Sequence, residues 1–199
     1  MRTLVKRGAT AQLPTEYGEF ITTPYIQLAN GLEHLALMKG VWTESDAVLV
    51  RIHSSCMTGD IFGSCRCDCG EQLHESMRMI EENGQGVIIY LNQEGRGIGL
   101  FNKIHAYQLQ DEGLDTIQAN IALGFKSDER DYTIGCHILK DLGIKRVQLI
   151  TNNPDKSFAL EKAGFQIEKC ISMEISPNPH NKFYLETKKN KMGHKLEKV

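Results

Sequence analysis

Residues 146–170 read RVQLITNNPDKSFALEKAGFQIEKC and carry the clearest fold signal in the chain. An apolar run at 146–150 is followed by the turn Thr151–Pro154, a helical pattern over 155–163 and a second apolar run at 165–170. A strand, a helix and a second strand in this order are typical of a βαβ-like unit. The stretch therefore predicts an α/β fold.

The same alternation of strands and helices extends toward the N-terminus. Strand-like stretches occupy 19–26, 34–39, 47–52 and 87–91. Apolar periodicity predicts helices over 71–82 and 131–142, and a further helix that carries Leu100, Ile104 and Tyr107 on one face and ends at Gly113. We predict a layered mixed sheet flanked by helices, with residues 1–199 forming a single domain.

Composition and charge exclude several classes of protein. Of the 199 residues, 41% are hydrophobic and 24% are charged, which excludes a disordered, collagen-like or coiled-coil chain. The net charge of −2 argues against a protein that binds nucleic acid by neutralising its backbone. The longest strongly apolar run, Gly86–Leu91, is far shorter than the roughly 20 residues that cross a bilayer. The first residues lack the apolar core of a signal peptide, so we expect a cytoplasmic protein with no membrane partner.

Cysteine is the residue type with the clearest chemical signal. Four of the six cysteines fall within residues 56–69, at Cys56, Cys65, Cys67 and Cys69. In a reducing compartment such a cluster indicates metal binding or catalysis rather than disulfides. If the end of this stretch is extended, the side chains of Cys65, Cys67 and Cys69 point to one side. Converging thiolates suit Zn²⁺, which favours tetrahedral sulfur coordination.

The residue count alone leaves the type of site open. Four cysteines would close a structural zinc site, whereas three would leave a coordination position for water and make the site catalytic. The alternative to a metal is a set of small hydrophobic residues in a core. We interpret Cys136 and Cys170 in that second way.

Two loops have the chemistry of anion sites. After the strand at 146–150, Asn153 and Pro154 predict a helix N-terminus that binds a phosphate, with Lys156 adding charge; the alternative is a well-capped surface helix. The loop Glu94–Gly99 combines an arginine with glycines that let a ligand approach the backbone. The charged stretch Asp128–Asp131 is either functional or an ordinary helix cap. We interpret the lysine-rich C-terminal tail as a solvated end.

A series of motifs in a fixed order runs through almost the whole chain and resembles the GTP cyclohydrolase II family. The motifs that carry the resemblance are Leu13-Pro-Thr-x-x-Gly18, Cys56-x-Thr-Gly-Asp60, Cys67-Asp-Cys69-Gly70, Gln93-Glu-Gly-Arg-Gly-Ile-Gly-Leu100, Asn102-Lys-Ile104, Ala106-Tyr107, Leu109-Gln-Asp111, Asp115-Thr116, Ala119-Asn120, Leu123-Gly-Phe125, Asp128-x-Arg130-Asp-Tyr132, Thr151-Asn-Asn-Pro154 and Lys191-Met-Gly-His194.

The resemblance implies a homodimeric enzyme that catalyses the first committed step of riboflavin biosynthesis. GTP would lose C8 as formate and its β,γ-phosphates as pyrophosphate, giving 2,5-diamino-6-ribosylamino-4(3H)-pyrimidinone 5′-phosphate. The family pattern implies one Zn²⁺ per subunit on Cys56, Cys67 and Cys69, and Mg²⁺ bound with the triphosphate. Cys65 falls outside that pattern, so the resemblance favours three protein ligands plus water.

The resemblance also implies roles for individual residues. Tyr107 would lie near C8 as a proton donor or orienting hydroxyl, although a helix aromatic that fills an apolar face fits the periodicity equally well. Arg130 would be the nucleophile toward the α-phosphate and Asp128 the proton acceptor, whereas clamping phosphates is chemically simpler for an arginine. The GTP-contacting positions would be Arg51, Ile52, His53, Ser54, Ser55, Gln72, Glu94, Gly95, Arg96, Thr116, Thr151 and Lys156.

Three positions depart from the family pattern. The family usually has Glu where this chain has Ser55, and Arg where it has Asn92 and His105. These departures keep two alternatives open. One is a diverged relative that stops at a formylated product or serves another GTP-derived pathway. The other is a non-catalytic, zinc-stabilised binding module, which would use four thiolates.

Overall fold

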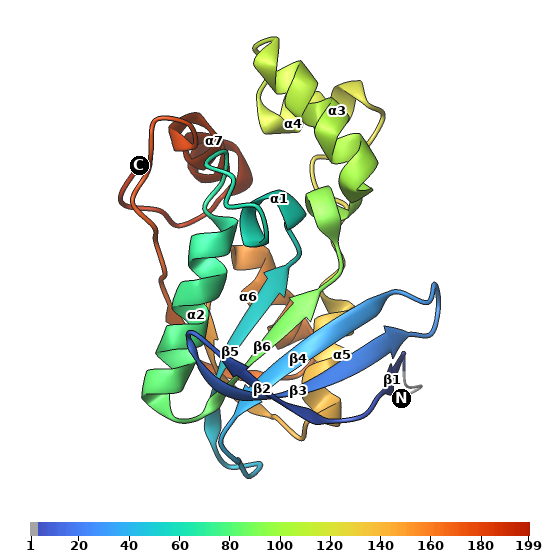
Figure 1. Cartoon of the computed structure of the whole chain (residues 1–199), viewed down its shortest axis with the longest axis vertical. Helices are drawn as coiled ribbons and strands as arrows, with labels where there is room; N and C mark the ends of the chain where they lie inside the picture. Colours follow the sequence, from blue (N-terminus) through green and yellow to red (C-terminus); the bar gives the residue numbers. More distant parts are fainter. Residues whose placement is uncertain (1–3) are drawn as a thin grey trace. The chain divides into compact units, whose positions relative to one another are not determined.

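The structure is a computed structural model and describes residues 4–199. Strands and helices alternate along much of the chain, which confirms the predicted α/β class with a mixed sheet flanked by helices (Figure 1). In chain order the elements are β1 (Val5–Arg7), β2 (Ala11–Thr15), β3 (Gly18–Gln27), β4 (Glu33–Lys39), β5 (Ala47–Ser54), α1 (Met57–Asp60), α2 (Cys69–Asn83), β6 (Gly86–Leu91), η1 (Glu94–Gly97), α3 (Gly99–Asp111), α4 (Thr116–Ala122), α5 (Thr133–Asp141), β7 (Arg146–Ile150), α6 (Pro154–Lys162), β8 (Gln166–Ile171) and α7 (Lys182–Met192).

Internal contacts divide the described chain into two compact units. Unit 1 holds the described residues up to His53 together with Leu73–Asn92 and Tyr132–Met173. Unit 2 holds Ser54–Gln72, Gln93–Asp131 and Glu174–Val199. That residues 1–199 form a single domain stays a prediction. No helix within residues 4–199 combines the length and the apolar character needed to span a bilayer.

The sheet belongs to unit 1, and its strand order is β1-β3-β4-β6-β5-β7-β8, with β2 paired to β3. The pairs β1–β3, β3–β4 and β4–β6 are antiparallel, whereas β5–β7 and β7–β8 are parallel. The helix α6 connects β7 to β8, which confirms the βαβ unit predicted from residues 146–170. Because β5 and β7 are parallel, their carboxyl ends lie at the same edge, where open α/β sheets bind ligands.

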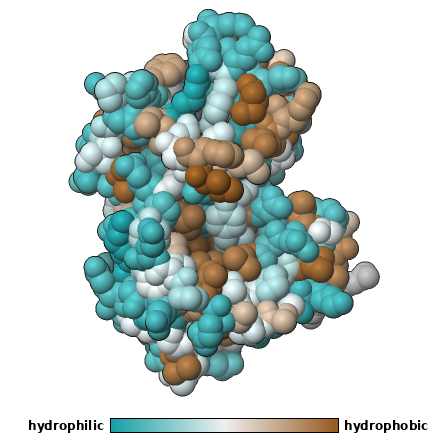
Figure 2. All heavy atoms as spheres, viewed as in Figure 1, coloured by the Kyte–Doolittle hydropathy of each residue, from teal (hydrophilic) through white to brown (hydrophobic). Residues whose placement is uncertain are grey.

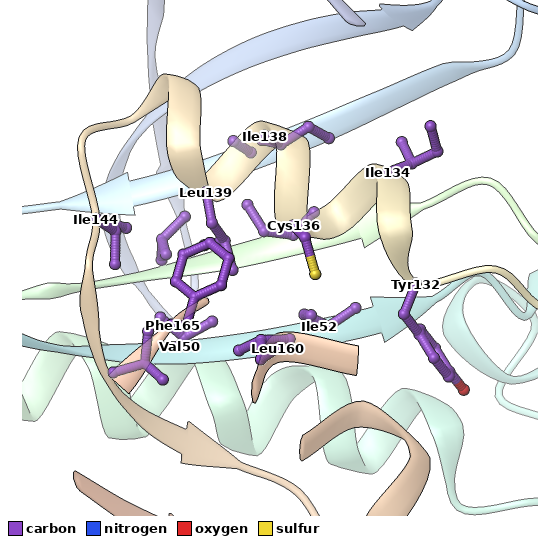
Figure 3. Packing of buried hydrophobic residues seen from close by; sticks show 14 of the residues in the cluster. Val50, Ile52, Tyr132, Ile134, Cys136, Ile138, Leu139, Ile144, Leu160 and Phe165 are labelled. Atoms are coloured by element: carbon purple, nitrogen blue, oxygen red, sulfur yellow. The ribbon is translucent and has the colours of Figure 1, made fainter. Parts of the chain in front are cut away.

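The two faces of the sheet carry separate apolar clusters. Val48 and Val50 of β5 belong to the cluster covered by α5 and α6, whereas Leu49 between them belongs to the cluster covered by α2. This alternation follows from the two-residue period of a strand and gives unit 1 three layers. Figure 3 shows Ile138 and Cys136 of α5 on the same side of the sheet as Val50 and Ile52. The prediction that Cys136 is a core residue is confirmed.

Cys170 contradicts the prediction made for it. It is exposed rather than buried, because β8 is the last strand of the sheet and most of its residues are exposed.

The predicted strands and helices all form, with ends within a few residues of the predicted ones. The sequence reading missed β1, β2, α1, α4 and α7. In β2, Pro14 is tolerated because this strand pairs only with β3.

The C-terminal tail is not the solvated end that its lysines predict. Residues Lys182–Met192 form α7, and Gly193 ends the helix in the left-handed region with a φ of 66°. Lys188 and Lys191 stand three residues apart on this helix and form ion pairs with Asp68 and Asp115. The prediction is therefore wrong for Lys188, whose side chain is only 12% exposed, whereas Lys191 stays 53% exposed although it pairs with a buried carboxylate.

Candidate metal centre and nucleotide site

Three thiols converge in unit 2. Cys56 precedes α1, Cys67 lies in the loop after α1, and Cys69 is the first residue of α2. Their sulfur atoms all lie within 4.8 Å of one another, and Cys56 Sγ is 3.7 Å from Cys67 Sγ. Tetrahedral Zn–S bonds of about 2.3 Å would place two sulfur ligands about 3.8 Å apart. The three thiols therefore fit a zinc ion.

The short helix α1 is built to leave room for these sulfurs. A Cβ at Gly59 would lie 2.8 Å from Cys67 Sγ and 3.2 Å from Cys56 Sγ, so a larger residue would displace the thiols. The Asp60 carboxylate accepts a hydrogen bond from the Cys56 backbone N–H at 2.9 Å and fixes the start of the helix. These contacts give a structural reason for the motif Cys56-x-Thr-Gly-Asp60.

Cys65 does not join the three thiols. It is exposed, and its Sγ lies 4.0 Å from the carbonyl oxygen of Gly63. The expectation that an extended stretch points Cys65, Cys67 and Cys69 to one side is wrong, because residues 65–66 form a turn and α2 begins at Cys69. Cys56, Cys67 and Cys69 stay the predicted metal ligands.

The three thiols differ in acidity. Hydrogen bonds from Cys67 and then Cys69 lower the pKa of Cys56 far below its ordinary value, and the charge of Lys103 adds to this effect. Hydrogen bonding to Cys56 raises the pKa of Cys67 to about 11 and also raises the pKa of Cys69. The neighbouring thiols and the Lys103 ammonium thus favour the thiolate form at Cys56, and a cation that binds the three sulfurs releases the protons that they hold.

Lys103 on α3 is a site residue that the sequence reading missed. Its side chain is buried, and its Nζ donates to Cys56 Sγ at 3.1 Å and to Glu94 Oε1 at 2.7 Å. Burial lowers the pKa of Lys103, but the Glu94 carboxylate and the Cys56 thiolate outweigh burial and raise it above its ordinary value. The signal that could have found this ammonium was its place in the motif Asn102-Lys-Ile104.

The loop η1 carries predicted substrate-binding residues in a strained backbone. Glu94 Oε2 accepts from the Met57 backbone N–H at 2.6 Å, which ties the loop to α1. Gly95 and Arg96 have φ values of 62° and 60°, and Arg96 is the one non-glycine residue with positive φ in the described part of the chain. Such strain is typical of functional sites. Both terminal nitrogens of Arg96 are buried without a hydrogen-bond partner in residues 4–199, which suits binding of an anion.

Tyr107 lies against the same part of unit 2. Its hydroxyl is 3.2 Å from Thr58 Oγ1 of α1. The cations of Arg66 and Lys103 lie 5.0 Å and 5.6 Å from the centre of its ring. Burial raises the pKa of Tyr107, and the Thr58 hydrogen bond opposes this only in part. The hydroxyl is therefore protonated at neutral pH and can donate a hydrogen bond beside the thiols.

The side chains of Asp128 and Arg130 form an ion pair with several hydrogen bonds. Arg130 Nε donates to both carboxylate oxygens of Asp128, at 2.9 Å and 3.1 Å, and one terminal nitrogen donates to Oδ2 at 2.5 Å. Burial raises the pKa of Asp128, but Arg130 outweighs burial and lowers it below its ordinary value. Whether Arg130 clamps a phosphate or acts as a nucleophile stays a prediction.

Four further predicted residues of unit 2 lie in or beside β5, α2 and α4. Gln72 Nε2 donates to Asp68 Oδ2 at 2.6 Å. Ser55 Oγ accepts from the Gln93 backbone N–H at 3.1 Å. The hydroxyl of Ser54 is buried without a hydrogen-bond partner in the described residues, and Thr116 is the first residue of α4. Their contacts with a substrate stay predictions.

The remaining predicted residues lie together in unit 1, at the carboxyl edge of the parallel strands. Arg51 donates to the carbonyl oxygen of Ile150 at 3.1 Å, and Lys156 Nζ donates to the carbonyl oxygen of Ile52 at 2.8 Å. Thr151 directly follows β7, and the ring of His53 stacks on Tyr90 with centroids 5.4 Å apart.

The turn before α6 forms as the sequence predicts. The side chain of Asn153 accepts from the Asp155 backbone N–H at 2.9 Å, and Pro154 opens the helix. Lys156 is buried and already holds a backbone carbonyl, so it does not project from the first turn as a surface residue would. Its role toward a phosphate stays a prediction.

Comparison with known proteins assigns the family. The family model of GTP cyclohydrolase II matches residues 6–172. The chain belongs to the GTP cyclohydrolase II family. The resemblance predicted from the motifs is thereby confirmed, and with it the prediction that the chain is related to enzymes of this kind.

The curated relatives of this GTP cyclohydrolase II family member are longer than the chain itself. The riboflavin biosynthesis protein RibBA of Porphyromonas gingivalis is 57% identical over 196 residues, which are 98% of this chain and 48% of that protein. RibBA of Parabacteroides distasonis is 54% identical over 196 residues, with the same two coverages. The chain therefore spans about half the length of the curated relatives it matches.

One solved structure is a more distant match. The crystal structure of RibBX, a two-domain 3,4-dihydroxy-2-butanone 4-phosphate synthase from A. baumannii, has a TM-score of 0.47 and 22% identity to this chain. The match covers 87% of this chain and 41% of that one. Neither fold nor function is transferred at this level of similarity.

Proposed function

We propose that this chain hydrolyses GTP and opens the imidazole ring of guanine. Formate and pyrophosphate leave, and 2,5-diamino-6-ribosylamino-4(3H)-pyrimidinone 5′-phosphate remains, as the first committed step of riboflavin biosynthesis. The observation that carries this proposal is the convergence of Cys56, Cys67 and Cys69 in a chain of the GTP cyclohydrolase II family. The two terminal nitrogens of Arg96, which are buried and lack a hydrogen-bond partner in the described residues, support an anionic substrate.

We further propose that the three thiols hold one Zn²⁺ per subunit and that Mg²⁺ accompanies the triphosphate. The sulfur separation and the burial of Cys56 and Cys67 support this assignment. A zinc ion held by Cys56, Cys67 and Cys69 would keep a position for water and would lower the pKa of that water to about 7. The ammonium of Lys103 offsets part of the negative charge of the thiolates.

The side chains around the thiols divide the work on the substrate. The Glu94 carboxylate accepts hydrogen bonds from the N1–H and amino groups of guanine, which discriminates against adenine. The hydroxyl of Tyr107 lies near C8 of guanine, where it acts as a proton donor or orienting group. Arg96 and Arg130 bind phosphate oxygens, and Asp128 holds Arg130 in place.

The test is the release of formate and pyrophosphate from GTP by the purified chain. We expect equal amounts of both products, loss of turnover with a zinc chelator, and recovery on addition of zinc. Cys67→Ser should lose the metal, whereas the matched variant Cys65→Ser should keep it. If Cys65→Ser loses the metal as well and GTP is not consumed, the non-catalytic module with four thiolates is the better account.

Ser55 favours one alternative product. Its hydroxyl accepts a backbone hydrogen bond from Gln93, so a position where the family usually has a carboxylate is occupied by a structural contact. We propose as the second candidate that the reaction stops at a formylated intermediate. Mass spectrometry of the product distinguishes the two, because retention of the formyl group would contradict complete hydrolysis.

We also propose that the chain acts as a homodimer. In unit 2, Phe101 on α3 is 75% exposed and Phe62 after α1 is 74% exposed. Exposed apolar residues are also visible among the hydrophilic ones on the face drawn in Figure 2. Large exposed aromatic side chains support a protein contact surface. Light scattering tests this: Phe101→Ser should shift a dimer toward monomer, and a monomeric parent chain would contradict it.

A further inference from the structure

The C-terminal helix α7 lies outside the residues that the family model matches, yet it reaches the loop that carries two of the thiols. The match ends at residue 172, and α7 begins at Lys182. On α7, Lys188 Nζ donates to Asp68 Oδ1 at 2.8 Å. Asp68 stands between Cys67 and Cys69 in the chain. The side chains of Lys188 and Asp68 are only 12% and 3% exposed, so water screens this ion pair little.

Asp68 also fixes the first turn of α2. Its second carboxylate oxygen accepts from Gln72 Nε2 at 2.6 Å, and its backbone carbonyl accepts from the Gln72 N–H at 3.0 Å. Cys69 is the first residue of that turn. A shift of the Asp68 side chain would therefore shift the backbone on which Cys67 and Cys69 are mounted.

Two further contacts hold α7 in unit 2. Lys188 Nζ lies 4.4 Å from the centre of the Tyr184 ring on the preceding turn of the helix. Lys191 Nζ lies 2.5 Å from Asp115 Oδ2, and the Asp115 carboxylate caps α4. The helix thus supplies one ammonium group to each of two buried carboxylates. Removing either lysine would leave an uncompensated buried charge, which proteins tolerate poorly.

We propose that Lys188 is a positioning residue of the metal centre, which acts through Asp68 to fix the turn that presents Cys67 and Cys69. The inference rests on the proposed function for the presence of zinc. The placement of the thiols is testable without zinc and without GTP. Groups that orient metal ligands in this way typically change metal affinity by about tenfold to a hundredfold.

The first experiment measures thiol accessibility in the metal-free full chain. Lys188→Met is compared with Lys182→Met, which removes an exposed lysine from the same helix. Iodoacetamide labelling is followed peptide by peptide, with exposed Cys170 as the internal reference. We expect Lys188→Met to label at Cys67 and Cys69 at least fivefold faster than the parent chain, and Lys182→Met to stay within twofold.

The second experiment measures zinc affinity by competition with a chelator. Lys188→Met should bind zinc about tenfold to a hundredfold more weakly. The double variant Asp68→Asn with Lys188→Met leaves no uncompensated charge, so it should recover part of that loss. If Lys188→Met fails to fold, Lys188→Gln is tested instead. This variant keeps a hydrogen-bond donor, so we expect Cys67 and Cys69 to be labelled two- to fivefold faster than in the parent chain.

Two results would overturn the positioning role. One is labelling of Cys67 and Cys69 that matches the Lys182→Met control. The other is slower labelling, since loss of a nearby cation alone makes the thiols less acidic and less reactive. GTP turnover enters neither readout. A chain that shows the Lys188 effect but leaves GTP intact would refute the proposed function and keep this inference.

Discussion

Unit 2 contains two positively charged side chains, Lys103 and Arg96, that differ in whether their nitrogens have hydrogen-bond partners. Lys103 is enclosed by partners, with Cys56 and Glu94 both within hydrogen-bond distance of its ammonium. Arg96 has two terminal nitrogens that are buried without a hydrogen-bond partner in the described residues, on a backbone held at positive φ, although its guanidinium lies 5.8 Å from the centre of the Tyr184 ring. A cation with partners organises a site, whereas a buried cation without them is suited to a ligand.

Replacing Lys103 by Met should disrupt the predicted metal centre. Cys56 and Glu94 would lose their shared donor, so zinc affinity should fall about tenfold to a hundredfold and GTP turnover at least as much. Chelator competition and formate release measure the two effects. Lys126→Met, which removes a lysine whose side chain is 80% exposed, is the matched control. Equal zinc affinity in the two variants would contradict the role given to Lys103.

Asp128 should make stability depend on acid pH. Although burial raises its pKa, Arg130 lowers it below the ordinary value of about 3.9, so the folded chain favours the carboxylate. The stabilisation is complete above the unfolded-state pKa and is lost as pH falls through the lower folded-state pKa. Urea unfolding of the metal-free chain below about pH 5 should therefore show a shallower loss in Asp128→Asn than in the parent. Parallel curves for the two chains would exclude this contribution.

At the scale of elements, the helix α3 exposes most of the apolar residues that its periodicity predicts to be buried. Leu100, Phe101 and Ile104 are exposed, whereas Lys103 and Ala106 are buried. Periodicity predicts that a helix forms here, but it does not say which face the rest of the chain covers. The buried face includes a charged group because the Lys103 ammonium donates to Cys56 Sγ, and the exposed apolar residues support the proposed dimer contact.

The loop before α3 should tolerate substitution at one glycine better than at another. Gly95 and Gly99 both have positive φ, at 62° and 81°. A Cβ at Gly95 would lie 2.9 Å from Lys103 Cβ, whereas one at Gly99 meets no atom within 4 Å. Gly99→Ala should cost only the backbone strain of about 1–2 kcal/mol. Gly95→Ala should cost more in chemical denaturation and also weaken zinc binding, and equal losses would contradict this reading.

The sequence predicted the elements whose signal is local and failed where tertiary contacts decide. The strand at 146–150 forms at its predicted residues, because a short apolar run between turn residues suits a buried strand. The tail failed, because α7 gains its order from Asp68 and Asp115, which lie far away in the chain. The ligand set came from the family motif, since local geometry suggested an extended stretch that does not form.

At the scale of the whole molecule, the two units are stabilised in different ways. In the described residues, both buried apolar clusters lie in unit 1, on the two faces of the sheet. In unit 2 the buried contacts described above are thiols, ion pairs such as Lys188–Asp68, and the capping box of α4. A bound metal would therefore contribute more to the local stability of unit 2 than to that of unit 1.

Removal of the metal should therefore reduce the local stability of unit 2 more than that of unit 1. Hydrogen exchange with and without a zinc chelator should show lost protection at the amides of α1, the first turn of α2 and α3. The amides of β5 and β7, in the apolar core of unit 1, should keep their protection. Uniform loss across both units would mean that the metal stabilises the fold as a whole.

The ion pairs of α7 also bear on how this protein is prepared. A chain shortened to the family-matched residues would end at 172 and would lack both Lys188 and Lys191. Asp68 and Asp115 would then lose the lysines with which they form ion pairs. We therefore expect a chain trimmed at residue 172 to bind zinc more weakly than residues 1–199 do.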